Sequence, residues 1–222
     1  MSSDIKIAVS RISGVTDKDD ESAPYNRLLS ALIEHTKFNI QRDYYPTARS
    51  NLLLEQQMVD CIFPIAKGAF RRDIEVIYSQ SVNRVTTHLF SYGEQPFLHL
   101  SDVADEVVVY IRGYLFGDLV KTQPYNVSFV PVDSHQSALQ VLQSGRAKAY
   151  LEYLPDLRFA LSASQIQPLR FAKAHPVQET FDIFECYASN HNAQFIENLN
   201  QVLVRFKSSG QLKLLLGDYY NL

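Results

Sequence analysis

Several features that mark other protein classes are missing from this sequence. No stretch approaches the roughly 20 consecutive apolar residues of a membrane-spanning helix, which argues against direct membrane insertion. The 21 lysine and arginine residues form no run, and the formal net charge is −3. The chain therefore lacks the basic patch expected of a protein that binds nucleic acid or an anionic membrane.

The beginning of the sequence lacks the pattern of a secretory signal. Such a signal has a charged region, then an apolar region, then small residues, whereas here residues 1–4 lead directly into the apolar segment Ile5–Val9. This start suits either a cytoplasmic protein or a chain from which a signal has been removed. The sequence leaves both interpretations open.

Cysteine is scarce, because Cys61 and Cys186 are the only two. Each lies in an apolar, strand-like run, where cysteine packs as a small hydrophobic residue. We therefore expect two free, buried thiols. No CxxC pair occurs, which disfavours the usual structural zinc site, and we expect no bound metal.

Catalytic motifs are also absent. The six histidines are scattered, with no HExxH pair, and there is no GxSxG, P-loop or GxGxxG sequence. We expect a protein without catalytic residues and without a cofactor. Residues that are distant in sequence can still meet in the fold, so an enzyme stays open as an alternative.

What the sequence does contain is a regular alternation of strand-like and helix-like segments. Apolar residues make up 46% of the chain, enough for a substantial core. The βαβαβ rhythm occurs twice, which predicts parallel sheets covered by helices. The predicted strands are 5–9, 38–44, 59–65, 85–90, 106–111, 127–132, 147–151 and 183–188, and the predicted helices begin near 24, 47, 114 and 134.

The last part of the chain is predicted to be helical. Apolar residues recur at helical spacing from Phe195 to Phe206, and Asn190 or Asn192 is the expected N-cap. Ser208–Gly210 ends this helix, and a short final helix follows.

Five segments, in order along the chain, resemble those of the bacterial extracellular solute-binding proteins of family 3, the polar amino-acid class of ABC transporters. They are Tyr45–Leu54 with Val59–Cys61, Phe70–Arg72 with Val76–Ser79, Val107–Gly113, Gly145–Ala149, and Asn198–Gly210 with Asp218–Tyr220. Each motif is short, but the set covers nearly the whole chain.

The resemblance implies an α/β protein with the two-lobe, type 2 periplasmic binding fold, each lobe a mixed, mostly parallel sheet covered by helices. Lobe 1 would comprise residues 1–84 and 188–222, and lobe 2 residues 85–187. The hinge would lie near residues 83–87 and 186–189. The two cysteines would then lie on separate strands, which favours the free thiols.

The resemblance also implies a function. The chain would be a periplasmic monomer that captures a small polar, carboxylate-bearing ligand, an amino acid or organic acid, for the membrane permease of an ABC transporter. Two alternatives remain: a ligand-sensing domain of a signalling protein, and a small-acid lyase or dehydratase on the same fold.

Candidate ligand-binding residues in the first lobe follow from the same resemblance. Arg72 matches the family's arginine, whose planar guanidinium binds a carboxylate through two parallel hydrogen bonds. The alternatives are an exposed loop arginine or an arginine paired with Asp73 or Glu75. Lys67 lies where the family often has a hydroxyl residue, and Ser10 follows the first strand. Arg71 is expected in solvent.

Candidates in the second lobe depart from the family. Gly113 is expected to open a helix whose N-terminus binds an anion, with Arg112 beside it; an ordinary strand-to-helix turn is the alternative. Tyr153 stands where amino-acid binders have the aspartate that holds the ligand ammonium. Glu152 is its possible replacement, although neighbours on a strand point to opposite faces. A standard α-amino acid is therefore in doubt.

Overall fold

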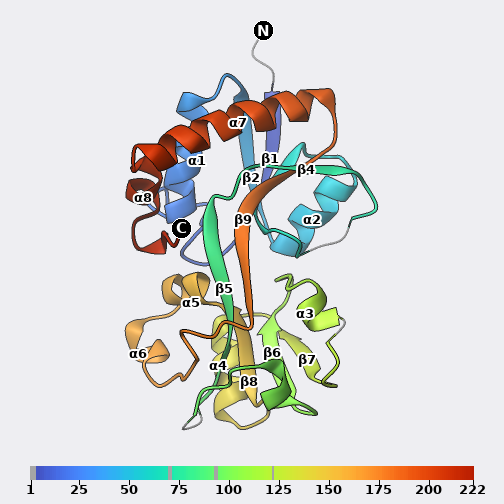
Figure 1. The fold of residues 1–222 in the computed structure, drawn as a ribbon, viewed down its shortest axis with the longest axis vertical. Coiled ribbons are helices and arrows are strands. Elements are labelled where there is room, and N and C mark those ends of the chain that lie inside the picture. Colours follow the sequence, from blue (N-terminus) through green and yellow to red (C-terminus); the bar gives the residue numbers. More distant parts are fainter. Residues whose placement is uncertain (1–3, 70–71, 93–94, 122) are drawn as a thin grey trace. The chain divides into compact units, whose positions relative to one another are not determined.

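The computed structural model describes residues 4–69, 72–92, 95–121 and 123–222. The chain divides into two compact units (Figure 1). Unit 1 runs to Arg84 and resumes at Phe181, and unit 2 is Val85–Thr180. The second change of unit thus comes at 180/181, earlier than the 187/188 predicted from the sequence. The reason is strand pairing, because residues 182–186 pair with a strand of unit 1.

Unit 1 is built on a mixed sheet. Its strands lie in the order β2-β1-β3-β9, with β4 also pairing with β9. The middle strand β1 is parallel to both neighbours, as the βαβαβ pattern predicts, whereas β9 is antiparallel to β3 and to β4. The strands are β1 (Asp4–Ser10), β2 (Asn39–Tyr45), β3 (Cys61–Ala66), β4 (Val76–Tyr78) and β9 (Gln178–Tyr187).

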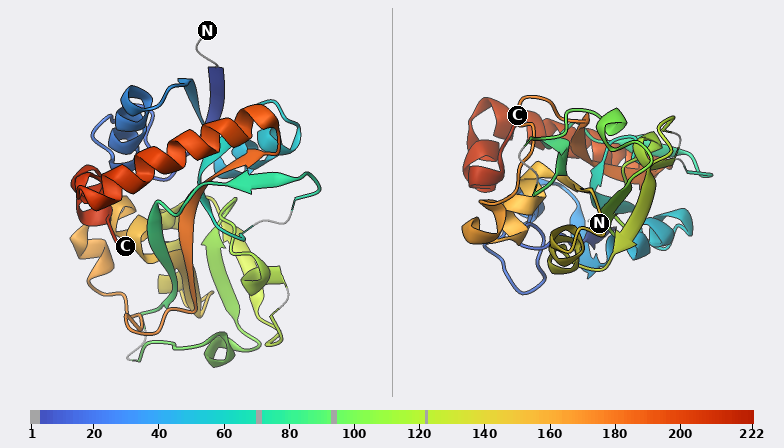
Figure 2. Two further views of the ribbon diagram at one scale, coloured as in Figure 1. Left: turned by 45° about the horizontal axis from the view of Figure 1, so that its top comes forward. Right: turned by 90° about the horizontal axis from the view of Figure 1, so that it is seen from below.

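The helices of unit 1 begin close to their predicted positions. They are α1 (Pro24–His35), α2 (Thr47–Glu55), α7 (Asn190–Ser208) and α8 (Gln211–Leu216), followed by the 3₁₀ turn η2 (Gly217–Tyr219). The long helix α7 crosses this unit (Figure 2) and buries its apolar face from Phe195 to Phe206, as predicted. Its N-cap is Ser189, whose hydroxyl accepts from the Asn192 N–H, and not an asparagine.

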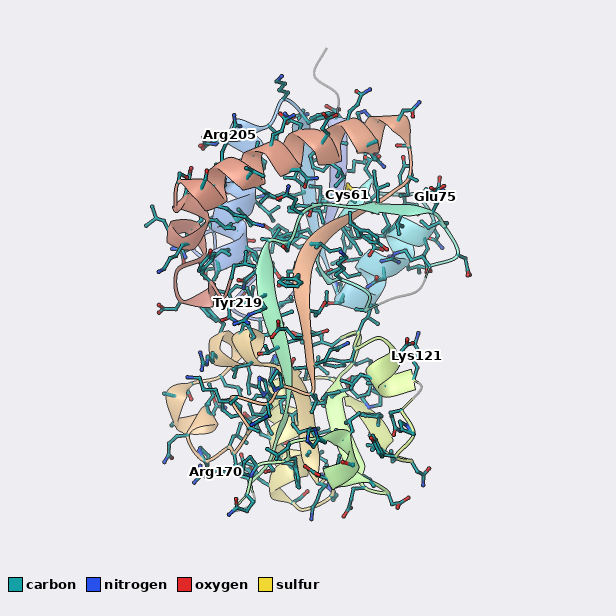
Figure 3. The ribbon with its side chains drawn as sticks, in the orientation of Figure 1. Cys61, Glu75, Lys121, Arg170, Arg205 and Tyr219 are labelled. Atoms are coloured by element: carbon teal, nitrogen blue, oxygen red, sulfur yellow. A yellow bond between two sulfur atoms is a disulfide. The ribbon has the colours of Figure 1, made fainter. Side chains whose placement is uncertain are left out.

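The expectation of two free thiols is wrong. Cys61 and Cys186 form a disulfide, visible as the yellow bond beside the Cys61 label in Figure 3. The two residues are direct partners in the antiparallel β3–β9 pair, with Cα atoms 4.0 Å apart and both side chains buried. Cysteines on separate strands can form a disulfide when the two strands are neighbours. Because Cys61 and Cys186 are 125 residues apart in the sequence, no local pattern shows that β3 and β9 are adjacent.

In unit 2 the strands lie in the order β5-β8-β6-β7. Strand β6 is parallel to β7 and β8, and β5 is antiparallel to β8. A core around Phe90, Val109 and Tyr150 fills the space under α4 and α5. The elements are β5 (Asn83–Phe90), η1 (Leu100–Val103), β6 (Val107–Ile111), α3 (Asp118–Lys121), β7 (Ser128–Val132), α4 (His135–Gln143), β8 (Ala149–Tyr153), α5 (Leu154–Ala160) and α6 (Ala163–Ile166).

Two parts of unit 2 differ from the sequence predictions. The helix expected from Tyr114 begins only at Asp118 and is a single turn, because Gly113 and Gly117 adopt positive φ on either side of an irregular segment. Helices α5 and α6 were not predicted, since both are short and lack a long apolar repeat. No helix within the described ranges has the length and apolar character needed to cross a membrane.

Candidate functional site

Ser10 and Lys67 lie at the carboxyl ends of neighbouring strands in unit 1. Ser10 is the last residue of β1, and Lys67 follows β3 directly. Because β1 and β3 are parallel neighbours, both residues lie at the same edge of the sheet, where open α/β sheets bind ligands. The Ser10 side chain is 1% exposed, and its hydroxyl has no hydrogen-bond partner among the described residues.

Arg72 is part of a buried polar cluster. Its side chain is 1% exposed, and its Nε donates to Glu185 of β9 in an ion pair. Its Nη2 donates to the Asn51 side chain at 2.6 Å, and Nη1 lies 3.8 Å from Glu55. The arginine therefore joins helix α2 to strand β9.

This arrangement gives Arg72 a structural partner that the sequence did not indicate. The guanidinium contacts Glu185, Asn51 and Glu55, which come from helix α2 and strand β9. Burial raises the pKa of Glu185, and the ion pair with Arg72 opposes that rise. Arg72 as a ligand clamp stays a prediction, and a ligand would have to compete with Glu185. Arg71 lies outside the described residues.

The Gly113 turn is not the start of a helix, so that part of the prediction is wrong. The Tyr114 N–H donates back to the Ile111 carbonyl at 3.0 Å, which closes a tight turn. Gly113 has a φ of 88°, the conformation that this turn requires and that glycine adopts without steric cost. The turn follows β6 at the carboxyl edge of the unit 2 strands. The Tyr114 N–H that was expected to bind an anion is already hydrogen-bonded to Ile111.

Arg112, beside this turn, lies on the surface. Its side chain is 62% exposed, and its Nε donates to Asp133 at 2.7 Å. The hydrogen bond to Asp133 raises the pKa of Arg112 further above its ordinary value. The ion pair therefore places one positive and one negative charge at the carboxyl ends of β6 and β7.

Glu152 is fully buried inside unit 2. Its carboxyl group accepts from the Tyr150 hydroxyl and from the Tyr153 N–H at 2.7 Å, and it lies 3.6 Å from Nδ1 of His135. Burial, and next the charge of Asp156, raise the pKa of Glu152 well above its ordinary value. Burial also lowers the pKa of His135 to about 4, so the histidine is neutral at pH 7. Burial therefore favours the protonated form of Glu152, whose carboxyl group is bonded internally.

The Tyr153 side chain contacts the segment that follows β6. Its ring stacks on Phe116 with centroids 4.8 Å apart, and its hydroxyl donates to the Leu115 carbonyl at 2.7 Å. The residue that stands at the family's ammonium-binding position thus holds the segment that follows Gly113.

The predicted residues fall into two groups. Ser10, Lys67 and Arg72 belong to unit 1, and Arg112, Gly113, Glu152 and Tyr153 belong to unit 2. Sequence reasoning missed the side chains that surround them: Glu185, Asn51, Tyr150 and His135. No local signal marks these partners, because each contact with Arg72 or Glu152 depends on which strands and helices are adjacent. Within the described part of the chain, no three His, Cys, Asp or Glu residues are grouped so that they could hold a metal ion.

Solved structures of binding proteins match this chain over nearly its whole length. An amino acid ABC transporter substrate-binding protein from Streptococcus pneumoniae, bound to L-arginine, is 15% identical with a TM-score of 0.75, covering 97% of this chain and 94% of that one. The GluR0 ligand-binding core from Nostoc punctiforme, in complex with L-glutamate, is 14% identical with a TM-score of 0.79, covering 98% and 100%.

A third match has a different role. A histidine kinase sensor domain with similarity to periplasmic binding proteins is 13% identical with a TM-score of 0.80, covering 98% of this chain and 96% of that one. No family model matches the sequence, and neither does any curated protein. These matches are binding proteins rather than enzymes, and at such identities they show the fold. The chain has the two-lobe α/β fold of the type 2 periplasmic binding proteins, as its resemblance to the family 3 solute-binding proteins predicted.

Proposed function

We propose that this protein is an extracytoplasmic solute-binding protein that captures a small carboxylate-bearing ligand for an ABC-type uptake system. The observation that carries the proposal is the Ser10 hydroxyl, a buried polar group at the carboxyl end of β1 without a partner among the described residues. Buried polar groups are normally hydrogen-bonded, and a bound ligand would supply the missing bond.

Positive charge near the strand ends supports an anionic ligand. Lys67 follows β3 directly, at the same edge of the sheet as Ser10. The positions that would hold a ligand ammonium group are unsuited to it, because the buried Glu152 carboxyl is bonded to Tyr150 and to the Tyr153 N–H, and the Tyr153 hydroxyl is bonded to Leu115. This favours an organic acid over a standard α-amino acid.

The disulfide supports a location outside the cytoplasm. Structural disulfides form and persist in oxidising compartments, such as the bacterial periplasm, and are rare in reducing ones. The bond between Cys61 and Cys186 is buried within unit 1, as expected of a structural disulfide.

Matched pairs of ligands test the proposal. Thermal denaturation is measured with glutamate against glutarate and with other dicarboxylates and aromatic acids. A ligand at about 100 times its Kd should stabilise the fold by roughly 2.7 kcal/mol. We expect glutarate, which lacks the ammonium group, to bind at least as well as glutamate. An acid that binds should also lose affinity in Lys67→Gln and Ser10→Ala.

Lys37→Gln is the matched control, because Lys37 is an exposed lysine of unit 1 away from the carboxyl ends of β1 and β3. The affinity of Lys37→Gln for the acid should equal that of the wild type. Absence of a shift with every acid, or equal losses in Lys67→Gln and Lys37→Gln, would contradict the proposed site.

The similarity to a histidine kinase sensor domain favours a second candidate, a ligand-sensing domain. The reading frame of the gene separates the two functions. A signal peptide without other domains indicates transport, whereas a membrane segment followed by a signalling domain indicates sensing. Turnover of a bound acid would instead support a lyase or dehydratase.

A further inference from the structure

The chain passes between the units twice, and the last segment of the sequence contacts both passages. The first passage begins at Asn83 and Arg84, the end of the first part of unit 1, and the second returns just before Asp182. Residues Tyr219–Asn221, which we call the latch, lie against both. In Figure 3 the Tyr219 label lies beside β5.

At the first passage the latch is bonded through both main chain and side chains. The buried Asn83 donates its amide to the Tyr219 carbonyl at 2.8 Å and accepts from the Asn221 N–H at 2.7 Å. Arg84 Nε donates to the Asn221 carbonyl at 3.1 Å, and the Asn221 amide donates to the Arg84 carbonyl at 3.3 Å. Two consecutive residues of β5 are thus each bonded twice.

At the second passage the contact is through one buried carboxyl group. Asp182 accepts from the hydroxyls of Tyr25 and Tyr219. The two tyrosine rings pack edge to face with centroids 4.9 Å apart. The Asp182 carbonyl also accepts from the Val82 N–H at 2.7 Å, which links it to the residue just before Asn83.

The path of the chain into the latch is also specific. Helix α8 ends at Leu216, and the next residue, Gly217, has a φ of 56°; a Cβ at that position would lie 3.2 Å from the Arg27 guanidinium. Glycine therefore permits the turn that brings Tyr219 to Asn83 and Asp182.

We infer that Tyr219–Asn221 is a conformational latch that holds the chain at both passages, so that loosening it at one passage loosens the other. The two passages are about 100 residues apart in sequence, but both are bonded to Tyr219. Its carbonyl accepts from the Asn83 amide, and its hydroxyl donates to Asp182. A segment bonded to both restricts the backbone rotations by which the chain turns there. Its effect on ligand affinity rests on the proposed function, but its effect on the backbone does not.

Hydrogen exchange of the ligand-free protein tests this inference. Tyr219→Phe removes only the hydroxyl that reaches Asp182, and Asn83→Leu removes both side-chain bonds to the latch. Each variant should speed amide exchange about 3- to 10-fold in peptides covering residues 83–90 and also in those covering 178–187, the effect expected from losing one or two hydrogen bonds. The decisive observation is acceleration at the passage that the substitution does not touch.

Asn39→Leu is the control, because it removes one side-chain amide bond, to Asp4, from an exposed position on β2 of the same unit. It should leave both passages unchanged. Acceleration confined to the substituted passage, or equal acceleration in peptides covering 39–45, would overturn the inference. If Asn83→Leu does not fold, the exchange rates of Tyr219→Phe at the two passages are sufficient to test the inference. A protein that binds no acid would refute the proposed function and leave the exchange result valid.

Discussion

The two units each bury a glutamate on a strand, but they stabilise it in different ways. In unit 1 Glu185 is ionically paired with Arg72, beside a disulfide that joins the same strand to β3. In unit 2 Glu152 is bonded to a tyrosine hydroxyl and a main-chain N–H, and a neutral histidine lies 3.6 Å away. A paired carboxylate keeps its charge, whereas an acid without a cation keeps its proton. Unit 1 should therefore be sensitive to reduction and to loss of the Arg72 partner, and Glu152 should add a sensitivity to rising pH in unit 2.

The largest effect is expected from removing the disulfide. Cys61→Ala with Cys186→Ala should lower the free energy of unfolding by about 5 kcal/mol, because the bond closes a loop across 125 residues. Urea denaturation measures the loss, and hydrogen exchange locates it. Amides of β3 and β9 should lose more protection than those of β6 and β7. Equal losses in both units would contradict the comparison.

The next effect concerns the buried ion pair. Arg72→Met should destabilise the protein by about 3–5 kcal/mol, because Glu185 is left buried without its partner. Replacing both residues, as Arg72→Met with Glu185→Leu, should recover most of that loss. Urea denaturation of the three proteins forms the test. If the double variant is as unstable as Arg72→Met, the unpaired charge of Glu185 is not the cause of the destabilisation.

Ligand affinity in the same variants separates the two roles of Arg72. If the arginine acts only as a structural partner, the double variant should bind the acid as well as the wild type does. If Arg72 also contacts the ligand, affinity should fall in both variants, whatever their stability.

The smallest effect is a dependence on pH in unit 2. The pKa of Glu152 is raised by burial, so the folded protein holds a proton that the unfolded chain releases above pH 4.5. The contribution of this group to stability is complete below that pH and is lost as pH rises toward its folded pKa. Glu152→Gln cannot ionise, so its stability relative to the wild type should increase from pH 5 to pH 9.

Tyr150→Phe serves as the control for this prediction. It removes the hydroxyl bond to Glu152 at a cost of about 1 kcal/mol but leaves the acid able to ionise. Denaturation at several pH values compares the three proteins. A constant difference between Glu152→Gln and the wild type would mean that Glu152 is not a protonated group in the folded state.

The fold was largely predictable, because its signals are local or repeat at short range. Alternating apolar segments indicated the strands of both units, and the face of α7 from Phe195 to Phe206 followed from helical spacing. The candidate site was less predictable. The positions of Ser10 and Lys67 at one edge of the sheet follow from strand order. The prediction of a helix directly after Gly113 was wrong, because Gly113 and Gly117 adopt positive φ and the helix begins only at Asp118.

By itself the sequence determined the alternation of strands and helices and the face that each helix buries, since side-chain spacing along one element decides which residues share a face. Only the tertiary structure decided the pairing of Cys61 with Cys186, the pairing of Arg72 with Glu185, and the raised pKa of Glu152. The paired residues lie 125 and 113 positions apart. Covalent pairing, ionic pairing and desolvation all depend on which strands become neighbours, and no local pattern in the sequence records that.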